Sequence, residues 1–355
     1  MAETGRPSAV RRAPRTAALA VVVLALGLLA WAKYVPYAIK VPHVLGTHSV
    51  GASILTGDGA LERGASLAAG WHFTVAYLSS VWQALVAGLV LASAVQVLLP
   101  VAWLERALGR AGGGRGGVRG ALLAVLTLMC SCCAAPLAVG LRRLRANLPA
   151  TVGFWLGNPA LNPVVLTLCL AVLPWPWAVL RLGAGLAVVA AGIAAARREE
   201  RRSPSSNDAS QTVVGTEEIA GAAPLPVRFL RALATLTVRL LPEFLLVVFA
   251  LGAFRSVLFP IGSAGPSVAI LAAGLVVAGL LLPVPTGGEV AVVAAGLAAG
   301  MPVAAAAVLL VTLPMLSLPS LLMVRSVVPR DVLVRTAAAT VGVGIVAALV
   351  APVLG

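Results

Sequence analysis

The chain of 355 residues contains 60% hydrophobic and only 11% charged residues, and its mean hydropathy is +1.01. Soluble domains carry roughly 25% charged residues, so this composition excludes that class and indicates an integral membrane protein. The net charge of +14 does not indicate nucleic-acid binding, because the arginines flank apolar runs with few aromatic residues among them. Continuous apolar runs also exclude a β-barrel, whose strands alternate.

The first 32 residues combine a basic N-terminus with an apolar run from Ala17 to Ala32. This pattern is typical of a transmembrane helix that starts in the cytoplasm, or of a signal peptide. The end at Ala30–Ala32 resembles a cleavage site, but the many later apolar runs favour a retained helix. Residues 33–70 are then expected to form an external loop.

The first membrane repeat is expected over residues 71–196, and its second apolar run, from Gly120 to Leu141, has Cys130–Cys133 at its centre. A complete crossing would place the arginines that follow Leu141 outside, against the positive-inside rule. A re-entrant hairpin with its tip at Cys130–Cys133 keeps them in the cytoplasm. About eleven residues of helix reach roughly 16 Å, about half of a hydrocarbon core of ~30 Å, so the tip is expected near the midplane.

The next apolar run, Pro149 to Leu173, is interrupted at Asn158–Pro163 by two amides and two prolines. The run from Ala178 to Ala196 returns to the cytoplasm, where residues 197–227 form a polar linker. Residues 228–355 then make a second membrane repeat.

A shift of 155 positions aligns Cys130–Cys133 with Pro285–Gly288, and Asn158–Asn162 with Leu313–Ser317, without a gap. The second repeat starts in the cytoplasm and the first starts outside, so the two have inverted topology. We therefore predict an all-α polytopic membrane protein, with two inverted repeats, a broken-helix or re-entrant hairpin in each, and an extra N-terminal helix. Paired broken helices meeting near the midplane are the architecture of secondary transporters.

The thiols of Cys130 and Cys132, with Cys133 beside them, are the candidate ligands for a soft metal or metalloid. The alternative is that they pack as small hydrophobic side chains. Asn158 and Asn162 share a helix face and are expected to line the site, or else to form hydrogen bonds between helices. The other candidate solute contacts are Ser131, Thr286, Gly287, Gly288 and Ser317.

Glu289 lies at the second tip, where a carboxylate is costly unless it is paired, protonated or exposed to water. It is the first candidate for coupling to H+ or Na+. Glu243 is the second candidate, with a position near the cytoplasmic interface as the alternative. The sequence contains no Gly-rich phosphate loop and predicts no cofactor, so an ion gradient or the membrane potential must supply the energy.

Three function classes fit these features. A secondary transporter for a small solute fits best. The alternatives are an intramembrane thiol redox enzyme, and a channel or membrane subunit of a larger complex. We expect a non-enzymatic protein that acts in the lipid bilayer on a small molecule or metalloid.

The order of these motifs also resembles a known family. The Cys130–Cys132 tip, the Asn158–Pro163 break, Gly287–Glu289 and Leu318–Leu321 resemble the bacterial predicted-permease family that includes the organoarsenical efflux permeases. The resemblance covers roughly residues 75–350. It implies a plasma-membrane permease that exports trivalent organoarsenicals through cysteine thiols. Many relatives carry a second Cys-Ser-Cys tip, where this chain has Pro285, Thr286 and Gly287.

Overall fold

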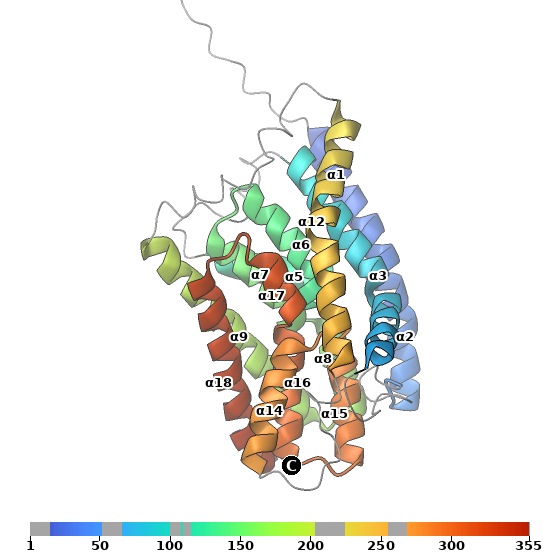
Figure 1. Cartoon of the computed structure of the whole chain (residues 1–355), viewed down its shortest axis with the longest axis vertical. Helices are drawn as coiled ribbons and strands as arrows, with labels where there is room; N and C mark the ends of the chain where they lie inside the picture. The colour runs from blue at the N-terminus through green and yellow to red at the C-terminus, as the bar shows by residue number, and fades with distance from the viewer. Residues whose placement is uncertain are drawn as a thin grey trace, which may run out of the picture.

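The computed structural model describes residues 15–51, 66–99, 108, 115–202, 224–254 and 268–354, and these residues form helices and connecting turns without strands (Figure 1). Within them, seven helices are long and apolar enough to cross a membrane. Shorter apolar helices lie between them. The prediction of an all-helical, multi-pass membrane protein is therefore confirmed.

The N-terminal helix extends well beyond the predicted boundary at Ala32. Helix α1 (Arg15–Leu29), a π-helical turn (Ala30–Tyr34) and α2 (Val35–Thr47) follow one another without a gap. The expected external loop from residue 33 is thus wrong as far as Thr47, and residues 52–65 of that loop lie outside the described residues. The helix continues because Pro36 occupies the first turn of α2, where its missing N–H is tolerated.

After this N-terminal helix, the described residues of the first half form six helices. They are α3 (Leu67–Leu98), α5 (Gly116–Thr127), α6 (Ser131–Arg143), α7 (Leu148–Ala160), α8 (Pro163–Val172) and α9 (Trp175–Arg202). The expected linker at 197–227 therefore begins inside α9, and its central residues 203–223 lie outside the described residues.

The described residues of the second half also form six helices. They are α12 (Leu225–Ala253), α14 (Val268–Leu281), α15 (Gly288–Ala298), α16 (Val303–Met315), α17 (Leu318–Val324) and α18 (Arg330–Leu354). Helices α16, α17 and α18 each begin 155 residues after α7, α8 and α9. The helix boundaries therefore follow the spacing that the sequence alignment gave.

Contacts between the halves pair corresponding helices. Helix α3 packs against α12, and α9 packs against α18. The short helices do not contact their counterparts in the other half. Instead, α6 contacts α17, and α15 contacts α8. In Figure 1 the pair α5 and α6 lies in the upper half of the molecule and the pair α14 and α15 in the lower half. Each tip thus faces the broken helix of the other half.

Candidate solute-binding site

The first tip is the short break between α5 and α6. Leu128 ends α5 in the left-handed backbone region, with φ of 51°, and Cys130 is the extended N-cap residue of α6. All three cysteines of the tip are at most 6% exposed. The sequence analysis placed the tip at Cys130–Cys133, and the structure has a helix break that ends there: α5 ends at Thr127, and Ser131 to Cys133 already form the first turn of α6.

The three thiols divide into two environments. The Cys130 and Cys133 Sγ atoms are 3.0 Å apart, one helical turn from each other. The Cys132 Sγ instead lies 2.9 Å from the Ser317 Oγ, which is also 3.4 Å from the Ser131 Oγ. Cys130 and Cys133 are therefore the sulfur pair with a direct contact of 3.0 Å, while Cys132 also interacts with Cys130 and faces the N-cap of α17 in the other half.

Asn158 holds the first tip in place. Its Oδ1 accepts hydrogen bonds from the Thr127 hydroxyl at 2.6 Å and from the Met129 backbone N–H at 3.1 Å. Its Nδ2 donates to the Phe154 carbonyl at 2.9 Å. These bonds match the interhelical role that the sequence left open, and its contact with solute stays a prediction.

Asn162 begins α8 as its N-cap residue. Its Oδ1 accepts from the Val164 and Val165 backbone N–H groups at 3.0 and 3.4 Å. The side chain is buried, and its Nδ2 has no hydrogen-bond partner among the described residues. A buried amide group with free donors is able to bind a solute oxygen.

The second tip lies between α14 and α15. Gly287 caps α15 with φ of 83°, a conformation that glycine adopts without a steric penalty. Thr286 lies just before it and accepts a hydrogen bond from the Lys33 ammonium at 3.4 Å. Gly288 begins the helix, and Glu289 lies in its first turn, where the helix dipole favours a negative charge.

Glu289 is 1% exposed and pairs with Arg181, which is equally buried. The Arg181 Nη2 lies 3.4 Å from the Glu289 Oε1 and donates to the Pro159 carbonyl at 2.6 Å. Arg181 thus binds both the second tip and a carbonyl freed where α7 breaks. The Glu289 Oε2 has no partner among the described residues.

The sequence analysis missed Arg181, although a single arginine inside the apolar run from Ala178 to Ala196 was a signal. Ionisable residues within membrane spans are rare and usually face a partner or a cavity. Glu289 was recognised by that reasoning, and Arg181 is the counter-charge it requires.

A small cavity of about 10 Å³ joins the two tips. Its lining comprises Met129, Cys130, Pro159, Val165, Val284, Pro285, Thr286, Glu289 and Pro314. Sulfur from the first tip and a carboxylate from the second therefore border the same space. The volume is close to the minimum for one water molecule, so this conformation leaves no room for a solute there.

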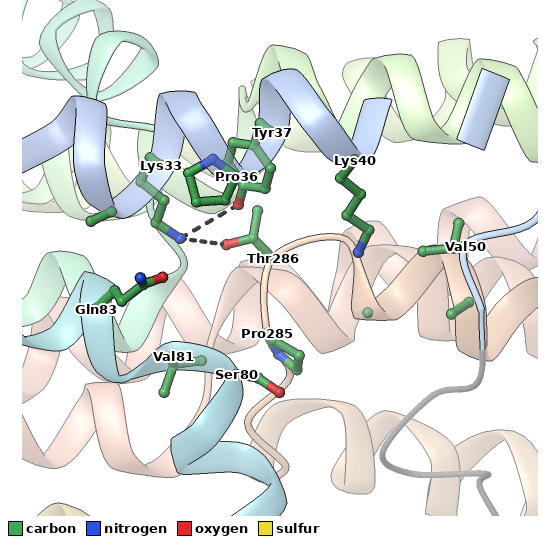
Figure 2. Close-up of a pocket in the computed structure, with 13 residues that line it drawn as sticks. Lys33, Pro36, Tyr37, Lys40, Val50, Ser80, Val81, Gln83, Pro285 and Thr286 are labelled. Atoms are coloured by element: carbon green, nitrogen blue, oxygen red, sulfur yellow. Dashed lines mark hydrogen bonds between the residues drawn. The ribbon is translucent and has the colours of Figure 1, made fainter. Parts of the chain in front are cut away.

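A larger cavity of about 270 Å³ lies on the other side of Pro285 and Thr286 (Figure 2). Lys33, Tyr37 and Lys40 line it from the N-terminal helix, opposite Ser80 and Gln83 of α3. The sequence analysis missed Lys33, Tyr37 and Lys40 because it assigned residues 33–70 to an external loop.

Glu243 lies apart from both cavities. Its Oε1 accepts from the Arg325 Nη2 at 2.6 Å, and the two side chains are 31% and 57% exposed. This partly exposed ion pair joins α12 to the end of α17 and fits the interface position that the sequence analysis gave as the alternative.

Comparison with known proteins agrees with this architecture. Residues 66–353 match a family described as "Predicted permease". The chain belongs to this permease family. It is also 36% identical over 330 residues to the UPF0718 protein YraQ of Escherichia coli strain K12, covering 93% of this chain and 92% of that protein. No solved structure matches the chain.

Family membership confirms the resemblance found in the sequence and makes the chain a membrane permease. The matched region includes both tips, Arg181 and Glu289. It begins at residue 66, after the helix that carries Lys33 and Lys40. Lys33 and Lys40 therefore lie outside the region that the family match covers.

Proposed function

We propose that this permease is a secondary transporter that exports a soft trivalent metalloid species. The favoured substrate is a trivalent organoarsenical with one organic substituent on arsenic. The observation that carries the proposal is the thiol pair Cys130 and Cys133, whose sulfur atoms are 3.0 Å apart and of which Cys130 borders the same cavity as Glu289. Exchange between a closed and an open arrangement of the two tips would give the solute access to this cavity.

The number of converging thiols favours a particular substrate class. Among the described residues, no three His, Cys, Asp or Glu side chains form a metal-binding group. A trivalent arsenical with one organic substituent has two bonds left for sulfur. Two thiols displace its two hydroxyl groups as two water molecules, and each sulfur forms one bond to arsenic. Inorganic arsenite has three exchangeable hydroxyls, and a single thiol pair satisfies only two of them.

Inverted repeats with re-entrant hairpins are the second part of the proposal. Support comes from the 155-residue spacing of α7 and α16, and from the opposite ends at which the pairs α5/α6 and α14/α15 lie (Figure 1). Single cysteines that replace Arg145 and Ala299, both exposed, test it with a membrane-impermeant thiol reagent. We expect labelling from opposite sides, and labelling from one side would contradict the inversion.

Glu289 is the proposed coupling residue for H+ or Na+. It is buried, it borders the thiol cavity, and one of its oxygens has no described partner. A proton or cation on that oxygen would weaken the pair with Arg181 and free the second tip. Glu243 has none of these properties, so we give it a structural role.

A thiol redox enzyme is the second candidate, and the short Cys130–Cys133 distance favours it. Formation of a disulfide would release two electrons and two protons to an acceptor of the quinone or disulfide class. Reduction of such an acceptor by the purified protein, with no solute counterflow in liposomes, would support the enzyme over the transporter.

Uptake into everted membrane vesicles tests the transporter directly. Phenylarsenous acid and methylarsenous acid are compared with inorganic arsenite in the parent protein and in Cys130→Ser, Cys133→Ser and Cys132→Ser. We expect at least a tenfold loss for the first two and a smaller loss for the third. Cys169→Ser is the matched control, because Cys169 is also fully buried but lies alone on α8. Unchanged transport in all four variants would exclude thiol ligation.

A further inference from the structure

The chain contains only two lysines, Lys33 and Lys40, and the other 24 of its 26 basic residues are arginines. The two lysines are seven positions apart on one continuous helix, which corresponds to two turns and places them on one face. Both line the cavity of about 270 Å³. Both lysines of the chain therefore line the same cavity.

The polar lining of this cavity comes from three separate parts of the chain. Lys33, Tyr37 and Lys40 belong to the N-terminal helix, Ser80 and Gln83 to α3, and Thr286 to the second tip. In Figure 2 the side chains of Lys33, Lys40, Gln83 and Thr286 point toward the space between these elements. Every one of these polar groups is able to donate a hydrogen bond.

Lys33 is buried without a carboxylate partner among the described residues. It is 7% exposed, and its ammonium donates to the Tyr37 hydroxyl and the Thr286 hydroxyl, each at 3.4 Å. It also lies 5.4 Å from the centre of the Tyr37 ring. A buried ammonium is costly when only neutral groups surround it.

Glu289 is an electrostatic neighbour of Lys40, but its carboxylate is already paired with Arg181 at 3.4 Å, so the positive charge of the two lysines remains in excess. No described carboxylate lies within ion-pair distance of Lys33 or Lys40. The Cys130 and Cys133 thiols are electrostatic neighbours of Lys33, and neither lines the larger cavity. The larger cavity thus has two cations and several neutral donors.

We propose that this cavity binds a small oxyanion of the sulfate or phosphate class. Such an ion supplies the missing negative charge to Lys33 and Lys40 and accepts from the surrounding hydroxyl and amide donors. The volume holds the ion with several water molecules, since one water occupies roughly 30 Å³ of liquid. Bound there, the anion joins the N-terminal helix to the second tip. This site is independent of metalloid binding by the thiols.

Amine acylation measures occupancy directly because the chain has two lysines. The full-length protein, in detergent with zwitterionic lipid only, is treated with succinimidyl acetate, and peptides are quantified by mass spectrometry. We expect sulfate or phosphate to slow acetylation of Lys40 at least fivefold relative to chloride at equal ionic strength. The amino-terminal amine is the internal control and keeps its rate. An equal rate at Lys40 in all three salts would overturn the proposal.

Equilibrium binding of radiolabelled sulfate provides the second measurement. We expect Lys33→Gln and Lys40→Gln each to weaken binding at least tenfold, and Lys40→Arg to retain part of it. Arg198→Gln removes one positive charge from an exposed position and serves as the control. Equal losses of sulfate binding in all three glutamine variants would show that binding depends on net charge alone. This result would contradict a defined site.

Two further outcomes would assign the lysines to another role. A headgroup phosphate offers the same chemistry as free phosphate, so the acylation is repeated in nanodiscs containing phosphatidylglycerol. Protection by that lipid alone, with none from free sulfate or phosphate, would make this a binding site for a lipid headgroup. It would overturn the proposal that the cavity binds a free oxyanion. If Lys33→Gln alters only the alkylation rate of Cys130 and leaves sulfate binding intact, Lys33 serves the thiols instead.

Discussion

The two tips occupy corresponding places in the two halves, but different interactions hold them. The first tip carries three thiols and is braced by Asn158, which accepts from Thr127 and Met129. The second tip carries no sulfur, and Leu313 occupies the position that corresponds to Asn158. It is held instead by Gly287 and by contacts of Glu289 with Arg181 and of Thr286 with Lys33.

Under the proposed function, we expect this difference to separate solute binding from ion coupling. The first tip has neutral, soft ligands and a rigid hydrogen-bonded support, as a binding site requires. The second tip has charges that depend on residues from other helices, so a change of charge there is able to move it. We expect solute chemistry to follow the first tip and coupling to follow the second.

Removal of Arg181 is expected to produce the largest effect. Arg181→Leu leaves the Glu289 carboxylate buried without its counter-charge, which costs about 3–5 kcal/mol in the free energy of unfolding. Titration with SDS in mixed micelles measures this loss. Transport should also fall below detection, since Arg181 joins the second tip to the broken helix α7.

The double variant Arg181→Leu with Glu289→Leu provides the control. Because it removes both charges, we expect it to recover most of the stability while transport stays absent. If the double variant is as unstable as Arg181→Leu, the pair does not account for the loss and packing of the arginine stem does.

Asn158→Leu makes the first tip resemble the second and is expected to have the next largest effect. The substitution leaves the Met129 N–H without its acceptor, and an unsatisfied buried group costs about 1–3 kcal/mol. The same SDS titration measures this loss in the free energy of unfolding. Gln96→Leu is the control, because among the described residues the Gln96 amide donates to the Ala92 carbonyl of its own helix. Equal losses in both variants would contradict the bracing role.

Local signals made the helix breaks predictable from the sequence. Asn158–Pro163 combines amides with prolines, and the structure ends α7 at Ala160 and begins α8 at Pro163 with Asn162 as its cap. Proline and capping residues act within a few positions of themselves. The break at Cys130 was found through arginine positions, which report membrane topology rather than local backbone preference.

The charged part of the site was not predictable in the same way. Arg181 and Glu289 are 108 positions apart, and Lys33 and Thr286 are 253 apart. Such pairs depend on how distant helices pack, and no short motif contains them. Lys33 was further hidden because residues 33–70 were expected to form a polar external loop, whereas α2 continues to Thr47.

Gly287→Ala is expected to have a moderate effect on the second tip. Its φ of 83° costs about 1–2 kcal/mol for a residue with a Cβ, and the added methyl group would also crowd Leu168. Unfolding in SDS measures the loss. Gly183→Ala is the control, since Gly183 lies inside α9 with open space around it. If both alanine variants behave alike, the second tip does not depend on this backbone conformation.

The smallest effect is expected for Glu243→Gln. The ion pair with Arg325 is partly exposed, and such pairs contribute about 0–1 kcal/mol. Transport in proteoliposomes should therefore keep both its rate and its dependence on an imposed pH or Na+ gradient. Glu289→Gln, compared in the same assay, should lose the gradient dependence. The opposite result, with coupling lost only in Glu243→Gln, would move the coupling site away from the second tip and to the junction of α12 with α17.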